Sequence, residues 1–123
     1  MSHYVLVCGG RDFNDYPRAR EPIRILAVLH GQDLRVMHGG ARGADMLAEE
    51  IAIEFGIKTK AFPADWNTHG KAAGPIRNVQ MADYLDMCRS KGHTVEVMAF
   101  PGGKGTAHMV STATERNIVV NQM

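Results

Sequence analysis

Residues 34–56 read LRVMHGGARGADMLAEEIAIEFG, and this stretch sets two kinds of pattern next to each other. The first five residues, LRVMH, form a short apolar run typical of a buried strand, and a glycine-rich turn follows at once. The remainder predicts a helix, because Leu47, Ile51 and Phe55 recur every four residues on one face. Gly56 is a suitable residue to end that helix. A strand, a tight turn and a helix make one unit of an α/β fold.

The same alternation continues along the rest of the chain. Apolar runs predict four more strands: HYVLVC (3–8), KTKAF (58–62), TVEVMAF (94–100) and NIVV (117–120). Apolar residues at helical spacing predict helices within 17–31, 72–92 and 105–117; Pro17 and Pro22 require the first of these to begin near or between them. Right-handed crossovers then favour a Rossmann-like three-layer sandwich whose five-stranded, mainly parallel sheet has the order 3-2-1-4-5.

Composition limits the classes of protein to which the chain can belong. Its 123 residues suit a single domain, 1–123, and 45% hydrophobic with 22% charged residues is ordinary globular composition. No apolar stretch is long enough for a membrane span and no secretory signal is evident, so we expect a cytoplasmic protein without membrane contacts. Two distant cysteines indicate reduced thiols. A net charge of +1 gives no broad nucleic-acid footprint, so an anionic ligand must be held locally.

Three glycine clusters follow predicted strands: CGGRD (8–12), HGGARGAD (38–45) and FPGGKGT (100–106). In an open parallel sheet, ligands bind beyond the carboxyl ends of the strands. Glycine lets the backbone approach an anion, and helix amino termini offer unpaired N–H groups, so phosphate fits these clusters. A tight strand-to-helix turn would explain any one cluster equally well, but three together favour a site. The P-loop and G-x-G-x-x-G patterns are both absent.

The chain carries four characteristic segments: GGRDF, HGGARGAD, GKAAGPIRNVQMAD and AFPGGKGT. Together they resemble the SLOG superfamily of Rossmann-like nucleotide-binding proteins, specifically its YspA-type branch. PGGKGT is similar to the P-G-G-x-G-T signature of the LOG phosphoribohydrolases, and RNVQM is similar to their R-K-x-x-M segment. The resemblance covers nearly the whole chain. It implies that the glycine loop binds the phosphate of a nucleotide and that Arg77 lies near the ribose or phosphate.

The chain departs from the LOG pattern at two positions. Met109 stands where that family has a catalytic glutamate, and Asn78 stands where it has lysine. A thioether can neither activate water nor stabilise positive charge on the ribose, so LOG-type catalysis does not follow. We therefore favour a binding domain for a nucleotide-derived ligand, acting as a sensor or sequestering protein. The alternatives are an N-glycosidic hydrolase, with Arg77, Asp45 and Glu115 as catalytic candidates, and single-stranded DNA binding, suggested by distant resemblance to DprA.

We expect ligand contacts from the three clusters and from the segments around Trp66 and Arg77. Asp45 would either accept from ribose hydroxyls or cap a helix, and Trp66 would either stack on a base or pack as a lid. We expect no metal and no cofactor, because His38 and His69 fit no ligand spacing. Family resemblance and apolar helices favour a homodimer. The predicted ligand-binding residues are Gly9, Gly10, Arg11, Gly39, Gly40, Gly43, Asp45, Trp66, Gly74, Arg77, Asn78, Pro101, Gly102, Gly103, Gly105 and Thr106.

Overall fold

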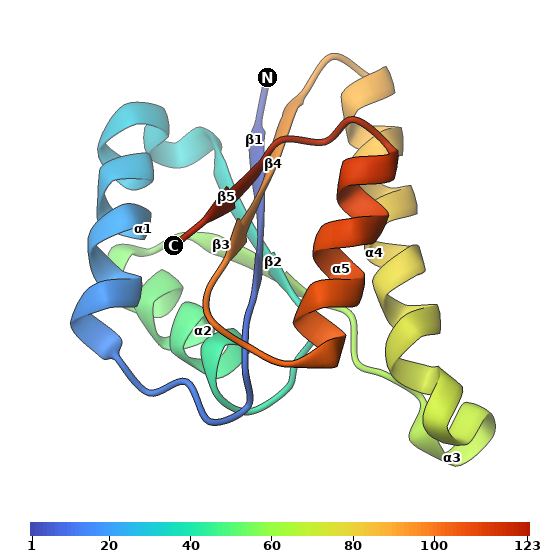
Figure 1. Cartoon of the computed structure of the whole chain (residues 1–123). Helices are drawn as coiled ribbons and strands as arrows, with labels where there is room; N and C mark the ends of the chain where they lie inside the picture. The colour runs from blue at the N-terminus through green and yellow to red at the C-terminus, as the bar shows by residue number, and fades with distance from the viewer.

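The computed structural model, which describes residues 1–123, is a parallel sheet between two layers of helices (Figure 1). The strand order is β3-β2-β1-β4-β5, and all four pairings are parallel. This confirms the α/β, Rossmann-like class and the strand order predicted from the sequence. The strands are β1 (His3–Cys8), β2 (Leu34–His38), β3 (Lys58–Ala61), β4 (Thr94–Ala99) and β5 (Val120–Gln122).

Both faces of the sheet are buried, because alternate side chains of β1 point into two separate cores. Val5 and Val7 pack with α1 (Tyr16–His30) and α2 (Ala44–Phe55) on one face. Leu6 and Cys8 pack with α4 (Ala73–Ser90) and α5 (Lys104–Glu115) on the other face. None of the helices combines the length and the apolar character needed to cross a bilayer. In Figure 1 the helix pairs stand on either side of the sheet, and the loops after β1, β2 and β4 meet at its lower edge.

Some local predictions differ from the structure. The strand expected at 117–120 begins only at Val120, because residues 117–119 turn the chain after α5, with Asn117 at a φ of 58°. By contrast, α1 starts at Tyr16, next to Pro17 as expected, with the Asp15 side chain accepting from the N–H of Arg18; Pro22 lies inside this helix. Between β3 and α4 lie α3 (Trp66–His69) and a 3-10 turn, η2 (Gly70–Ala72). A second 3-10 turn, η1 (Gly31–Asp33), precedes β2.

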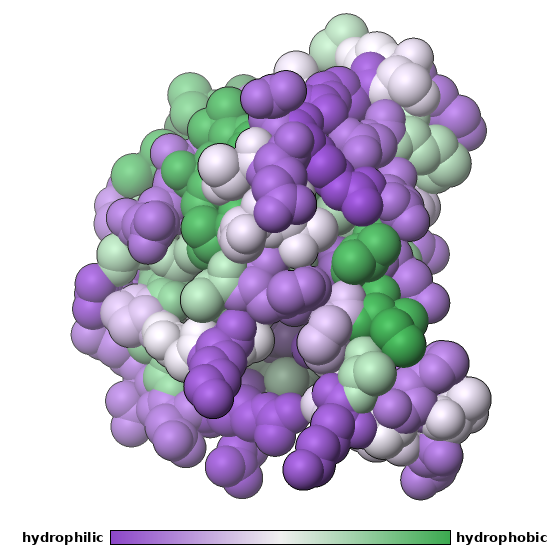
Figure 2. Space-filling model, turned by 45° about the vertical axis from the view of Figure 1, so that its right-hand side comes forward, coloured by the Kyte–Doolittle hydropathy of each residue, from purple (hydrophilic) through white to green (hydrophobic).

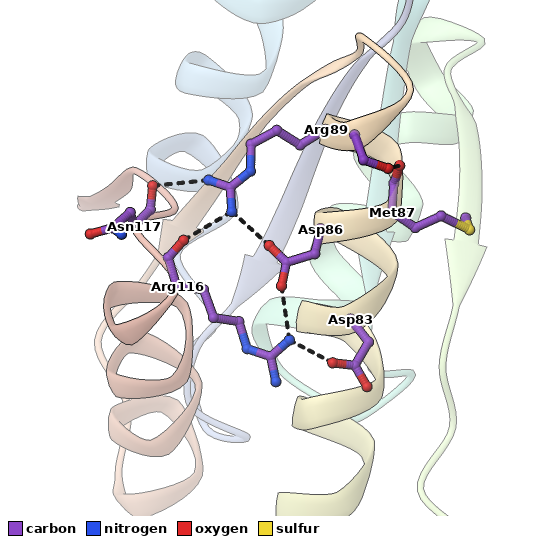
Figure 3. Close-up of polar contacts among 7 residues, drawn as sticks. Asp83, Asp86, Met87, Arg89, Arg116 and Asn117 are labelled. Carbon is purple, nitrogen blue, oxygen red and sulfur yellow. Dashed lines mark hydrogen bonds and ion pairs between the residues drawn. The ribbon is translucent and has the colours of Figure 1, made fainter.

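A polar clasp joins the carboxyl ends of α4 and α5, far from the lower edge of the sheet (Figure 3). The guanidinium of Arg116 donates to Asp83 at 2.5 Å and to Asp86 at 3.0 Å. Arg89 donates to Asp86 at 2.6 Å and to the carbonyls of Arg116 and Asn117, which follow α5. These carbonyls have no helical partner, so the bonds act as a cap. The clasp thus links the carboxyl end of α5 to the side chains of α4.

Candidate ligand-binding cavity

A cavity of about 650 Å³ opens at the carboxyl ends of β1, β2 and β4. Figure 2 shows a hollow in the lower part of the molecule with a mostly hydrophilic rim. This volume lies within the range of small-molecule sites. The structure brings twelve of the predicted residues to its lining: Gly9, Gly10, Arg11, Gly39, Asp45, Trp66, Gly74, Arg77, Asn78, Gly103, Gly105 and Thr106.

Other predicted residues lie outside the lining. Gly40, Gly43, Pro101 and Gly102 belong to the same glycine loops but do not face the cavity. Glu115 is the last residue of α5, ~16 Å along the helix from its first residue. The lining also includes residues that sequence reasoning did not select, among them Ala41, Lys71, Lys104, His108 and Met109. Helical spacing offered a signal for His108, since it lies one turn after Lys104 on the same face.

The first glycine loop (residues 9–12) ties the other two together. The N–H of Gly10 donates to the carbonyl of Pro101 at 2.9 Å, and the carbonyl of Gly10 accepts from Ala44 at 3.2 Å. A Cβ at Gly9 would lie 2.6 Å from the Cβ of Ala44. Glycine is therefore required here for close packing of backbone segments.

In the second glycine loop (residues 39–43), the first three backbone N–H groups are bonded within the chain. Those of Gly39 and Ala41 donate to Oδ2 of Asp45 at 3.0 and 3.2 Å. That of Gly40 donates to Nδ1 of His38 at 3.0 Å. Gly43 has a φ of 83°, and a Cβ there would collide with the backbone of the first loop. This loop is a closed, tightly packed turn.

The third glycine loop (residues 101–106) is open. The backbone N–H groups from Gly102 to Thr106 have no acceptor within the chain, and no side chain caps α5. A Cβ at Gly103 or Gly105 would meet nothing within 4 Å. Unpaired N–H groups at the amino end of a 12-residue helix carry partial positive charge. The loop is therefore suited to an anion.

Arg77 and Asn78 together connect the closed and open loops, because the amide of Asn78 donates to the carbonyl of Gly105 in the open loop. The Nη1 of Arg77 donates to the carbonyl of Gly39 at 2.7 Å, and its Nε donates to Oδ1 of Asn78 at 3.1 Å. Burial lowers the pKa of this guanidinium, and the charge of Asp45 opposes that shift. Nη2 has no partner in the chain, and no buried side-chain nitrogen or oxygen lacks one, so Nη2 is accessible. Because arginine stays protonated, it brings a positive charge to the cavity.

Asp45 is the single carboxylate in the lining, and its residue is only 7% exposed. Burial raises the pKa of this carboxyl, while the N–H groups of Ala41 and Gly39 and the charges of His38 and Arg77 act in the opposite direction. Both loop N–H groups go to Oδ2, so Oδ1 has no partner and keeps accessible surface. One carboxylate oxygen therefore supports the loop and the other is free to meet a ligand.

Cations and one aromatic ring complete the lining. Four basic residues, Arg11, Lys71, Arg77 and Lys104, outnumber the one carboxylate. Trp66 is 48% exposed, and the guanidinium of Arg11 lies over its ring at 5.5 Å from the centroid. An excess of positive charge beside an accessible aromatic face favours an anionic ligand with a flat group.

The apolar part of the lining is chemically inert. Met109 is fully buried in the core between α5 and the sheet. Burial, with the charge of Asp45 adding to it, raises the pKa of Cys8 to about 12, so this thiol stays protonated at neutral pH and is a poor nucleophile.

Comparison with known proteins now decides the family. A family model described as the YspA, cpYpsA-related SLOG family matches residues 3–69, more than half of the chain. The chain belongs to the SLOG family. The matched part holds the first two glycine loops and ends within α3, and the third loop lies beyond it. The Gene 61 protein of Mycobacterium phage D29 is 33% identical over 124 residues, covering 94% of this chain and 92% of that protein. The resemblance to the SLOG superfamily and to its YspA-type branch is thereby confirmed, and membership in SLOG supports a role in binding a nucleotide-related ligand.

Proposed function

We propose that this SLOG protein binds a nucleotide or nucleotide-derived ligand in the cavity, as a sensor or sequestering protein. The observation that carries the proposal is the run of unpartnered backbone N–H groups from Gly102 to Thr106, at the amino end of α5. A phosphate there would satisfy these donors and offset the local positive charge. The ligand is held in the 650 Å³ cavity that four of these five residues line.

The other lining groups fit the remaining parts of a nucleotide. The accessible Nη2 of Arg77 supplies a charged donor to the phosphate or ribose. The free Oδ1 of Asp45 is an acceptor for ribose hydroxyl groups. Trp66 offers a face on which a base can stack. The side chain of Arg11, which lies over this ring, would then either move aside or cover the other face of the base. Each contact comes from a different helix or its first turn, so the bound ligand would bridge α2, α3, α4 and α5.

Thermal denaturation with a panel of nucleoside mono- and diphosphates, cyclic nucleotides and dinucleotides tests this proposal. A ligand that binds only the native state raises the melting temperature. Trp66 is the one tryptophan in the chain, so its fluorescence reports binding independently. Gly103→Asp places a carboxylate in the open loop and should abolish the shift, whereas Gly103→Asn, matched in size but neutral, should retain it in part. Absence of a shift with every nucleotide, or equal shifts in both variants, would refute the site.

A second function, hydrolysis of a nucleotide N-glycosidic bond, is favoured by one observation. Asp45 is the single carboxylate of the cavity, and its raised pKa brings it closer to the range of a general base at neutral pH. It would accept a proton from water as the oxygen bonds to C1′ and the base departs. Release of free base by the wild type, lost in Asp45→Asn, would establish this enzyme. Release without any dependence on Asp45 would place the catalytic group elsewhere.

We further propose that the protein is a cytoplasmic homodimer. Apolar side chains remain exposed on the outer helices, including Val28 and Leu29 of α1, Ile53 of α2 and Met87 of α4. Pairing with a second copy would remove such surface from water. Both cysteines are unpaired, as in proteins of reducing compartments. Light scattering that gives the mass of one chain at micromolar concentration would contradict the dimer.

A further inference from the structure

His108 is a cavity residue with a defined hydrogen-bond environment. It lies on α5, one turn after Lys104, and its half-buried side chain forms part of the lining. Its Nδ1 lies 3.1 Å from Nδ2 of Asn78, which comes from α4. Asn78 is buried, at 4% exposure, so its amide has few alternative partners.

The neighbours of Asn78 fix the orientation of its amide. The Nε of Arg77 can only donate, so the atom 3.1 Å away must be the amide oxygen. The amide nitrogen then donates to the carbonyl of Gly105 at 3.2 Å and to Nδ1 of His108. The flipped amide would set two donors against each other at Arg77 and two acceptors against each other at Gly105. Both contacts oppose the flip.

This orientation also determines where the proton of His108 lies. Nδ1 accepts from Asn78, so the neutral ring carries its proton on Nε2. Nε2 has no partner in the chain, and no buried side-chain nitrogen lacks one, so Nε2 is accessible. A chain of bonds thus runs from Gly39 through Arg77 and Asn78 to His108, and it ends in a free N–H at the cavity.

We propose that His108 binds the ligand through Nε2–H, as a neutral donor to a phosphate or ribose oxygen, and that Asn78 is the positioning residue that holds this tautomer. The role rests on the proposed nucleotide function. In this state Nε2 cannot accept a proton from water, so His108 is a binding residue and not a general base. The donor lies one turn along α5 from the open loop, which extends the recognition surface past the phosphate.

Nuclear magnetic resonance of protein with ¹⁵N-labelled histidine tests the tautomer without any ligand. The chain has six histidines, and His108→Gln identifies the resonances of residue 108 by their loss. We expect the pattern of an Nε2–H tautomer in the wild type. In Asn78→Asp the carboxylate can only accept, so a proton should appear on Nδ1. An Nδ1–H tautomer in the wild type, or no change in Asn78→Asp, would overturn the proposal.

Titration with adenosine 5′-monophosphate tests the contact with ligand. Addition should shift the Nε2 resonance of His108, and His108→Leu should weaken binding roughly tenfold or more because a donor to a charged oxygen is lost. His108→Gln, which can still donate, should lose less. If the wild type binds and both variants bind as tightly as the wild type, the His108 contact is refuted while the nucleotide function stands. If the wild type shows no binding to any nucleotide in the thermal panel, the nucleotide function is refuted, and the ligand contact of His108 with it.

Discussion

The second and third glycine loops are similar in composition but opposite in hydrogen bonding. In the second loop, the N–H groups of residues 39–41 are all bound within the chain, to Asp45 and His38. In the third loop, the five N–H groups of residues 102–106 have no acceptor in the chain. A glycine cluster therefore has two distinct uses. One permits close packing of backbone, and the other leaves donors free for a ligand.

The glycines themselves show the same contrast. A Cβ at Gly39 would lie 2.6 Å from Cζ of Arg77, and one at Gly43 would collide with the first loop. Gly103 and Gly105 have open space around the equivalent position. Gly43 is required by the fold because its close neighbours are backbone atoms, and Gly39 leaves room for the side chain of Arg77. Gly103 and Gly105 have no such close neighbours, and both line the cavity.

The largest expected effect contrasts Gly43→Ala with Gly105→Ala. At Gly43, an alanine meets both a positive φ and a backbone collision, so we expect a loss of about 3–5 kcal/mol in the free energy of unfolding. At Gly105, inside α5, alanine should be neutral or stabilise by up to about 1 kcal/mol. Urea denaturation measures both. Equal destabilisation would contradict the distinction between a packed and an open loop.

Removal of the link between the loops should have the next largest effect. Arg77→Ala takes away the bonds to Gly39 and Asn78 together with the cavity charge. Loss of a charged donor should weaken nucleotide binding by about 1–3 kcal/mol. Arg77→Lys keeps the charge but lacks the planar fork, so it should restore only part of the affinity. Calorimetric titration gives these affinities, and full restoration by lysine would mean that the bonds to Gly39 and Asn78 are dispensable.

The carboxylate that closes the second loop should affect stability as a function of pH. The folded-state pKa of Asp45 is raised, so between the unfolded and folded pKa values the native state binds more protons than the unfolded state. Its contribution to stability is therefore lost as pH rises through that window, with a slope of at most about 1.4 kcal/mol per pH unit. Subtracting the unfolding free energy of Asp45→Asn at each pH isolates this slope. If the unfolding free energy of the wild type instead rises with pH relative to that of Asp45→Asn, the pKa of Asp45 is lowered by folding and the prediction is wrong.

The smallest effect is expected at the clasp, which touches neither loop. Asp83 and Asp86 raise the pKa of Arg116, but their side chains are 63% and 37% exposed, so Arg116→Ala should destabilise by only about 0–1 kcal/mol. Added salt should reduce the difference further. Nucleotide affinity should be unchanged, which makes this variant a control for Arg77→Ala. A large fall in affinity would show that the placement of α5 depends on its far end.

Much of the fold could be predicted because it depends on local periodicity. Alternation in β1 and four-residue spacing in α2 specify which faces are buried, and right-handed crossovers then leave few strand orders. The last strand was misplaced because Ile118 is buried without belonging to a strand. Apolar character reports burial, and it does not distinguish a strand from a packed turn.

The amino-acid pattern alone predicts that three glycine loops meet at one edge of the sheet, since carboxyl ends of parallel strands share an edge. Which of these loops is open depends on contacts made in the folded chain. They require Asp45 to fold back onto Gly39 and Ala41, and Gly10 to meet Pro101 across about 90 residues of chain. The packing of the helices likewise brings Asn78 next to His108 and leaves Glu115 at the far end of α5. Periodicity reflects interactions between residues that are neighbours in sequence. A hydrogen bond instead needs its two atoms within about 3 Å in space, and only the packed chain sets that distance.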